Sequence, residues 1–186
     1  MRSYQAWPKE LDIPWLNYLL VNAPIDFNPG FGWFDYPRDT APGAEQSYLL
    51  LHELLDAQRE RGFPTEETAL FGFSQGCFMV WEIGVRYPHR LAGCIGVSGW
   101  MREPTQLLQH KSPVATQQQF YTTHGLMDNK LPIENSRRQV DELKRAGLKV
   151  TWSELSKGHQ IDPIVERPMI RRIIAHMFKL PVGVQV

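Results

Sequence analysis

Hydrophobic residues along the chain fall into short continuous runs that alternate with longer stretches of helical periodicity. Short apolar runs bounded by Gly, Pro or Ser are typical of buried strands, whereas apolar residues that recur every three or four positions are typical of helices. The runs predict strands at Leu16–Val21, Thr68–Phe73, Leu91–Val97, Gln119–Thr123 and Lys149–Glu154. The periodic stretches predict helices at Ala44–Arg61, Gly76–Tyr87, Ile133–Ala146 and Pro163–Lys179.

This alternation predicts an α/β fold in which a mostly parallel sheet carries crossover helices on both faces. At 186 residues the chain has the size of one domain, so we expect residues 1–186 to share one core. One long stretch, Ala23–Gly43, is rich in Pro, Gly and aromatic residues and has no regular period. A loop of this length in a compact domain is more often functional than idle.

The charge balance does not favour nucleic acid or an anionic membrane as a partner, because 20 acidic residues match 20 basic ones. A neutral or mostly apolar small molecule fits better. The segment Met1–Val21 is interrupted by Pro8 and Pro14, which argues against a signal peptide and against membrane insertion. Cys77 and Cys94 lie in apolar surroundings without metal-ligand spacing, so we expect reduced thiols, no metal and a cytoplasmic protein.

Ser74 is the candidate nucleophile, because it lies in Gly72-Phe73-Ser74-Gln75-Gly76 between a predicted strand and a predicted helix. A G-x-S-x-G motif in this context is typical of a nucleophile elbow. The two glycines are expected to remove side chains that would collide with the strand and the helix. A helix that begins at Gln75 would direct its positive end toward a developing oxyanion. The alternative is a serine that only caps a helix.

An acid and a base follow the serine in the order expected after such an elbow, each on a loop behind a strand. Asp128 follows the strand that ends near Thr123, and His159 follows the last predicted strand. His159 would take the proton from Ser74, and Asp128 would orient the imidazole. An aspartate before a helix can also be a simple cap, and a histidine in a polar loop can belong to the plain surface.

Two further acids remain as alternatives. Glu154 lies in or at the end of its strand, and Asp162 follows the histidine instead of preceding it. His124, which precedes Asp128, fits a structural hydrogen-bonding residue better than a base. The other histidines lie in predicted helices, at a helix end or in a polar loop.

Together these motifs resemble the phospholipase/carboxylesterase family of small esterases, which includes the acyl-protein thioesterases. The resemblance spans nearly the whole chain. It rests on Ala23-Pro24, Trp33-Phe34-Asp35, Gly72-Phe73-Ser74-Gln75-Gly76, Ser98-Gly99, His124-Gly125 with Asp128 and Pro132, and Gly158-His159, in the family's order.

The resemblance implies an α/β-hydrolase fold, hydrolysis of esters or thioesters of small to medium acyl groups through an acyl-enzyme, and no cofactor. It also implies that the Gln75 N–H is an oxyanion donor. An acyl pocket is expected to form from the stretch Ala23–Gly43, called the aromatic loop below, and from the segment after Ser98. The alternative for aromatic residues in these loops is packing against the core. The oligomeric state is left open, a homo-oligomer included. The substrate-binding residues that we expect are Trp33, Phe34, Trp100 and Leu126.

One part of the family pattern is missing. The family has an earlier strand that ends in an H-G-x-G-D loop and donates an oxyanion N–H, and this chain begins after the point where that loop would end. We therefore expect N-terminal strands to be missing, and either a fragment of a longer gene product or direct pairing of Leu16–Val21 with the strand before Ser74. Losing one oxyanion donor typically lowers turnover about 100- to 1000-fold.

This gap keeps two other functions open. One is a catalytically weak protein of the same fold that binds a ligand or a partner. The other is a different acyl hydrolase, such as a peptidase or lactonase, because the fold does not determine the substrate.

Overall fold

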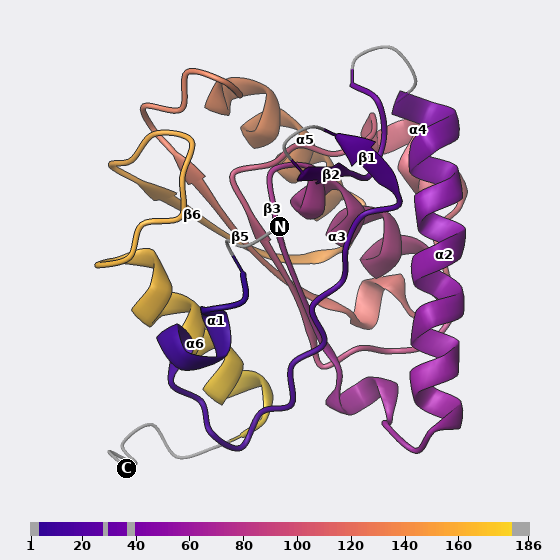
Figure 1. Ribbon diagram of the computed structural model, residues 1–186. Coiled ribbons are helices and arrows are strands. Elements are labelled where there is room, and N and C mark those ends of the chain that lie inside the picture. The colour runs from indigo at the N-terminus through magenta and orange to yellow at the C-terminus, as the bar shows by residue number, and fades with distance from the viewer. Residues whose placement is uncertain (1–3, 28–29, 37–39, 180–186) are drawn as a thin grey trace.

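A parallel sheet of four strands forms the centre of the computed structural model, which describes residues 4–27, 30–36 and 40–179 (Figure 1). The strands lie side by side in chain order, and each neighbouring pair is parallel. They correspond to the last four predicted strands, so the predicted α/β class is confirmed. Their bounds are β3 (Ala69–Phe73), β4 (Gly93–Val97), β5 (Gln119–Gly125) and β6 (Lys149–Leu155).

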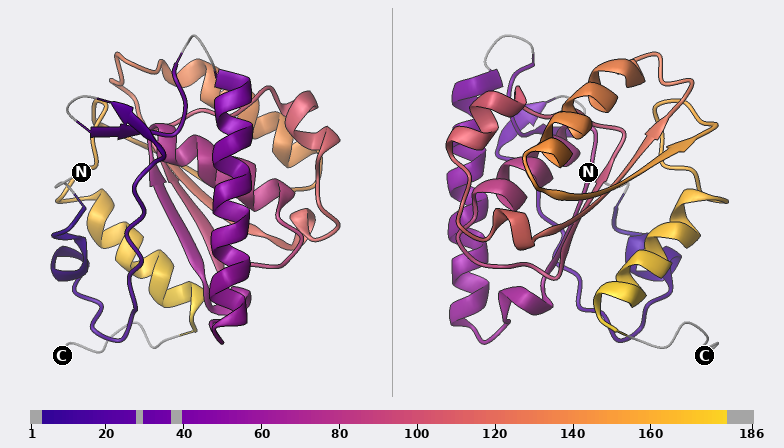
Figure 2. Two further views of the ribbon diagram at one scale, coloured as in Figure 1. Left: turned by 45° about the vertical axis from the view of Figure 1, so that its right-hand side comes forward. Right: turned by 180° about the vertical axis from the view of Figure 1, so that it is seen from behind.

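Helices cover both faces of the sheet, as the ribbon views show (Figures 1 and 2). Consecutive parallel strands joined by right-handed crossovers place their connecting helices on one face. The opposite face carries α6 (Glu166–Met177), which follows β6, and the short α1 (Trp7–Leu11) packs beside it. The face with the connecting helices carries α2 (Thr40–Glu60), α3 (Gln75–Arg86), α4 (Pro104–Gln109) and α5 (Ile133–Arg145).

The side chains of β4 show how the sheet divides the core into two parts. Successive residues of a strand point to opposite faces. Cys94 belongs to the hydrophobic cluster beneath α2, α3 and α5, whereas Ile95 and Val97 belong to the cluster beneath α1 and α6. All residues of β4 are buried. This burial on both faces explains why the stretch is a continuous apolar run and does not alternate with polar residues.

Several short elements were not predicted. Helix α1 and helix α4 each begin with proline in the first turn, and both are too short to show a clear helical period. The strands β1 (Ile25–Phe27) and β2 (Gly30–Gly32) form an antiparallel pair within the predicted aromatic loop. Two turns of 3-10 helix, Thr65–Glu67 and Ala115–Gln117, precede β3 and β5.

The starts of two helices differ from the predicted positions by three or four residues, whereas the other long helices lie within one residue of their predicted bounds. Helix α2 begins at Thr40 rather than Ala44. Pro42 is tolerated in its first turn, where backbone N–H groups have no intrahelical acceptor. Helix α6 begins at Glu166 rather than Pro163, because the residues before it form a turn around the carboxylate of Asp162. Among the helices of the described ranges, none is long and apolar enough to cross a membrane.

The predicted strand Leu16–Val21 is wrong, because this segment is irregular. Leu16 and Tyr18 pack against the cluster beneath α6, while Leu19 and Leu20 are exposed. A strand needs a neighbour for its backbone groups, and no strand of the described residues pairs with this segment. Direct pairing with β3 is therefore also wrong: within the described residues, β3 pairs with β4 alone.

Candidate active site

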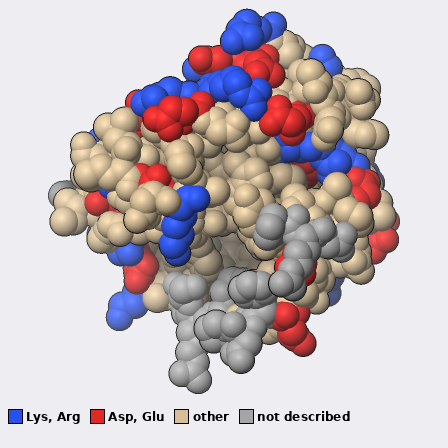
Figure 3. All heavy atoms as spheres, turned by 90° about the horizontal axis from the view of Figure 1, so that it is seen from above, with Lys and Arg blue, Asp and Glu red and all other residues tan. Residues whose placement is uncertain are grey.

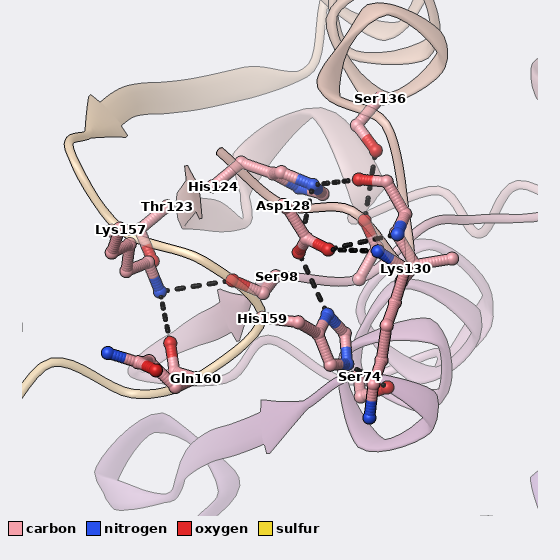
Figure 4. A network of polar contacts seen from close by, with 12 residues as sticks. Ser74, Ser98, Thr123, His124, Asp128, Lys130, Ser136, Lys157, His159 and Gln160 are labelled. Atoms are coloured by element: carbon pink, nitrogen blue, oxygen red, sulfur yellow. Dashed lines mark hydrogen bonds and ion pairs between the residues drawn. The ribbon is translucent and has the colours of Figure 1, made fainter. Parts of the chain in front are cut away.

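The three candidate catalytic residues lie at the same end of the sheet. Ser74 directly follows β3, Asp128 lies in the loop after β5, and His159 lies in the loop after β6. The carboxyl ends of parallel strands meet at one edge, which is where open α/β sheets bind ligands. Figure 4 shows the three side chains pointing toward one another.

Ser74 has the strained backbone of a nucleophile elbow, with φ of 55° and ψ of −118°. A non-glycine residue with positive φ costs about 1 to 3 kcal/mol and persists only where its surroundings impose it. Here the N–H of Ser74 donates to the carbonyl of Val97 at the end of β4 (2.9 Å), and α3 begins at the next residue. The turn therefore holds the serine between a strand and a helix, as predicted.

The two glycines of the motif have different roles. A Cβ at Gly72 would lie 2.2 Å from the carbonyl oxygen of Gly76, so no other residue fits there. A Cβ at Gly76 would meet only the indole Nε1 of Trp33, at 3.9 Å. The expectation that both glycines avoid a collision is thus correct for Gly72 and wrong for Gly76.

A continuous chain of hydrogen bonds joins the three candidate side chains. His159 Nε2 lies 3.0 Å from Ser74 Oγ, and His159 Nδ1 lies 2.8 Å from Asp128 Oδ2. An ionised carboxylate can only accept, so Nδ1 carries the proton and Nε2 is free to accept the serine proton. The hydrogen-bond distances expected from the sequence are therefore present.

Asp128 is held in its ionised form by the loop around it. Burial by itself raises the pKa of this carboxyl, but hydrogen bonds from the Leu131 N–H, the His159 ring and the Lys130 N–H outweigh burial and bring the pKa below its usual range. The two N–H groups donate to Oδ1 at 2.9 and 3.0 Å, which leaves Oδ2 for the histidine. Such a carboxylate can orient an imidazole and stabilise its charged form.

His124 is a structural neighbour of the acid. Its Nε2 lies 2.8 Å from the carbonyl of Leu131, and its buried ring stacks on Trp152. Burial lowers the pKa of His124. A neutral ring with Nε2–H therefore donates to the carbonyl that follows the Asp128 turn, which agrees with the structural role expected from the sequence.

The two alternative acids are engaged elsewhere. Glu154 forms a bidentate ion pair with Arg137, at 2.6 and 2.8 Å, and this contact lowers the pKa of Glu154 to about 2. Asp162 accepts the N–H groups of Val165 and Ile164, which lower the pKa of its carboxyl. In this structure Asp128, and neither of these two, occupies the position beside His159.

Gln75 has a second function that the sequence did not reveal. As the first residue of α3, its N–H has no intrahelical acceptor and can serve an oxyanion. Its side chain also accepts the N–H of Trp33 and donates to the carbonyl of Phe34, each at 3.0 Å. The glutamine therefore fastens the aromatic loop to the helix beside Ser74. The sequence contains both partners, in the W-F-D and G-F-S-Q-G motifs, but nothing in these motifs indicates that they are in contact.

The four expected substrate-binding residues differ in exposure. Trp33 and Trp100 are half-buried and Leu126 is 48% exposed, so all three can reach a ligand. Phe34 is 1% exposed and packs on Phe78, with ring centroids 4.8 Å apart. Phe34 therefore supports the neighbouring aromatic side chains from the protein interior. It cannot contact a substrate in this structure.

Charged and uncharged side chains are unevenly distributed on the face seen from above in Figure 3. Uncharged residues form much of its middle, charged side chains gather along its upper part and edges, and one basic side chain lies beside the central hollow. A cavity of about 240 Å³ lies beside Trp100, but the three catalytic candidates are not among its lining residues. An apolar cleft over Ser74 thus stays a prediction. The residues that line the cavity are Thr40, Ala41, Phe78, Trp100, Met101, Arg102, Glu103 and Gln106.

Cys77 fills the space behind the elbow. A Cβ at Gly96 or Gly99 would lie 2.6 or 2.7 Å from its Sγ, so the thiol occupies the room that these two glycines leave. Burial raises the pKa of Cys77 and that of Cys94 to about 12. Neither thiol is therefore a rival nucleophile at neutral pH.

Sequence reasoning also missed a buried ion pair beneath the histidine loop, between Lys157 and Glu166. A lysine before Gly-His and a glutamate at the start of a helix follow no recognisable pattern. Only their burial in the folded protein distinguishes them from surface residues.

Comparison with known proteins agrees with this geometry. A family model described as Phospholipase/Carboxylesterase matches residues 22–176. Acyl-protein thioesterase 1 of Schizosaccharomyces pombe is 30% identical over 136 residues, which cover 68% of this chain. Acyl-protein thioesterase 1 of Gibberella zeae is 25% identical over 181 residues, which cover 87% of this chain and 77% of that protein. The chain matches 61% of the length of the S. pombe relative.

The fold has close counterparts among solved structures. The crystal structure of Arabidopsis thaliana SOBER1 superposes with a TM-score of 0.86 over 95% of this chain and 92% of that one, at 20% identity. An identity this low speaks for the fold alone, which is that of the α/β hydrolases. The family model, by contrast, covers most of the sequence, including the elbow and the loops of Asp128 and His159. The chain therefore belongs to the phospholipase/carboxylesterase family.

Proposed function

We propose that the protein is a serine hydrolase that cleaves carboxylic esters or thioesters, with Ser74 as nucleophile, His159 as base and Asp128 as the residue that orients the base. The observation that carries this proposal is the hydrogen-bonded chain from Asp128 through His159 to Ser74, which ends on a strained elbow. Family membership and the names of the relatives support the reaction class.

The geometry supports a two-step reaction. His159 Nε2 accepts the hydroxyl proton while Ser74 Oγ attacks the carbonyl carbon, and the resulting oxyanion is stabilised by the Gln75 N–H and the positive end of α3. Collapse of the tetrahedral intermediate expels the alcohol or thiol, which takes the proton from His159. A water molecule then attacks the acyl-enzyme with His159 as base, and this step releases the acid and restores the serine.

The substrates are proposed to be small to medium acyl esters or thioesters. The half-buried rings of Trp33 and Trp100 and the exposed Leu126 offer apolar surface near the triad, and each buried methylene contributes about 0.8 kcal/mol. We place the reaction in the cytoplasm, because both cysteines are free and buried. Neither nucleic acid nor a membrane is proposed as a partner.

Turnover is expected to be slow. Within the described residues, Gln75 is the one backbone donor that we assign to the oxyanion. Loss of one of two donors typically lowers turnover by about 100- to 1000-fold. This expectation, which also motivates a ligand-binding role as the competing function, stays a prediction until rates are measured.

Labelling with a fluorophosphonate probe separates the two functions, because the probe reacts only with an activated serine. We expect the wild-type chain to be labelled and to hydrolyse a nitrophenyl ester. Ser74→Ala should abolish both reactions while leaving the circular dichroism spectrum unchanged, and Ser153→Ala, on β6, is the matched control. A wild-type chain that takes up no label, or a label that persists in Ser74→Ala, would rule out the proposal.

A further inference from the structure

Lys157 is almost completely buried although it lies in the loop of the candidate base, two residues before His159. Its side chain is 1% exposed, and that of its partner Glu166 is 0% exposed. Nζ donates to both carboxylate oxygens of Glu166, at 2.7 and 2.6 Å, to Ser98 Oγ at 3.0 Å and to the carbonyl of Gln160 at 2.7 Å. All three ammonium protons therefore have acceptors.

The carboxylate of Glu166 is equally well satisfied. This first residue of α6 also accepts the hydroxyl of Thr123, at the end of β5, and the N–H of Asp162 at 3.0 Å. The network thus joins the ends of β4 and β5, the loop after β6 and the start of α6. Figure 4 shows Lys157 reaching Ser98 and Gln160. Fully connected buried networks of this kind specify one arrangement of the groups around them.

The network holds the loop that carries the base His159 on both sides of that residue. Lys157 and Gln160 flank His159 in the chain, so the contact between Nζ and the Gln160 carbonyl closes the loop on both sides of the imidazole. The loop is also tied to the acid, because the N–H of Met127, next to Asp128, donates to the Lys157 carbonyl at 3.1 Å. Its fit is tight: a Cβ at Gly125 would lie 2.3 Å from that same carbonyl oxygen.

We propose that Lys157 is a positioning residue, which holds the His159 loop in register with Ser74 and Asp128 through its ion pair with Glu166 and its contacts to Ser98 and Gln160. The proposal rests on the hydrolase function proposed above. A general base must be placed within a fraction of an ångström, and a misplacement of about 1 Å can lower the rate about 100-fold. None of the four acceptors of Nζ belongs to the catalytic residues, so Lys157 acts through the backbone of the loop.

A structural role and a positioning role can be separated because of the energetics of buried ion pairs. Removing one partner leaves a lone buried charge and is strongly destabilising, whereas removing both charges together is often close to neutral for stability. Lys157→Met alone is therefore expected to unfold easily. The informative variant combines Lys157→Met with Glu166→Gln, because the amide oxygen can still accept from Thr123 or from the Asp162 N–H.

The double variant should fold with a melting temperature near that of the wild type, while kcat for a nitrophenyl ester falls about 10- to 100-fold and KM stays within about threefold. Fluorophosphonate labelling of Ser74 should slow by the same factor as kcat. The matched control is Arg138→Met combined with Glu142→Gln, which removes an exposed pair on α5. The control should retain full activity.

A readout that does not depend on turnover completes the test. The proton between His159 Nδ1 and Asp128 should give a far-downfield NMR signal, which we expect to weaken in the double variant as the ring loses its fixed orientation. A folded double variant with wild-type kcat and an unchanged signal would overturn the proposal. So would a loss of activity that parallels a loss of melting temperature while the signal persists. If the wild-type chain proves inactive, the hydrolase function fails, but the NMR comparison still decides the role of Lys157.

Discussion

At the scale of single residues, the two glycines of the elbow offer a matched pair of substitutions. Gly72→Ala should be severely destabilising, because the new Cβ would lie 2.2 Å from a backbone oxygen that cannot move away without disturbing the turn. Overpacking typically costs about 1 to 3 kcal/mol, and we expect at least this much. Gly76→Ala should be close to neutral, since the nearest atom lies at 3.9 Å. Urea denaturation measures the unfolding free energy of both variants. An equal loss of unfolding free energy in the two variants would contradict the geometry.

The acid of the triad can be tested in the same way. Asp128→Asn should lower kcat about 1,000- to 10,000-fold, because an amide in this position can stabilise the wrong tautomer of His159 and carries no charge to support the imidazolium. Glu154→Gln is the control, since that carboxylate faces Arg137. Steady-state kinetics on one ester suffices. If Glu154→Gln lowers kcat more than Asp128→Asn does, the acid has been assigned to the wrong residue.

At the scale of elements, the aromatic loop depends on α3 for its position. Ester hydrolysis across a series of acyl lengths should peak above acetyl, because each buried methylene contributes about 0.8 kcal/mol. Gln75→Ala keeps the backbone N–H but removes both hydrogen bonds to residues 33 and 34. It should therefore raise KM for long acyl groups more than for acetyl.

Gln109→Ala, at the exposed end of α4, is the control for this series. It should reproduce the wild-type preference for acyl length. An optimum at acetyl in the wild-type chain would exclude an apolar acyl site beside Trp33 and Trp100. A proportional rise of KM for every ester in Gln75→Ala would mean that the loop does not select by length.

At the scale of the whole molecule, the ionisation of Asp128 links stability to pH. Its pKa in the folded protein lies below that of an unfolded chain, which is about 3.9. The resulting stabilisation is fully present above about pH 4 and is lost as pH falls through the lower folded value. The difference in unfolding free energy between the wild type and Asp128→Asn should therefore shrink on acidification below about pH 4. Chemical denaturation at several pH values checks this; a constant difference would argue against a depressed pKa.

Local patterns of the sequence determined much of this protein. The order of four strands and four long helices followed from apolar periodicity and from Gly and Pro at the element ends. The residues Ser74, Asp128 and His159 could be named because each lies just after a predicted strand, and in a parallel sheet all such positions share one edge. The elbow needed only a pentapeptide between a strand and a helix. These signals depend on residues that are close in the chain.

The tertiary structure alone decided the features that depend on distant partners. Leu16–Val21 is apolar enough for a strand, but a strand exists only beside another strand, and β3 pairs with β4 alone among the described residues. Whether Phe34 meets a substrate was decided by its burial against Phe78. In the sequence Lys157 and Glu166 look like ordinary charged surface residues, whereas in the folded protein both side chains are buried. Burial and side-chain hydrogen bonding depend on residues far away in the chain. For this reason no local pattern of the sequence predicts them.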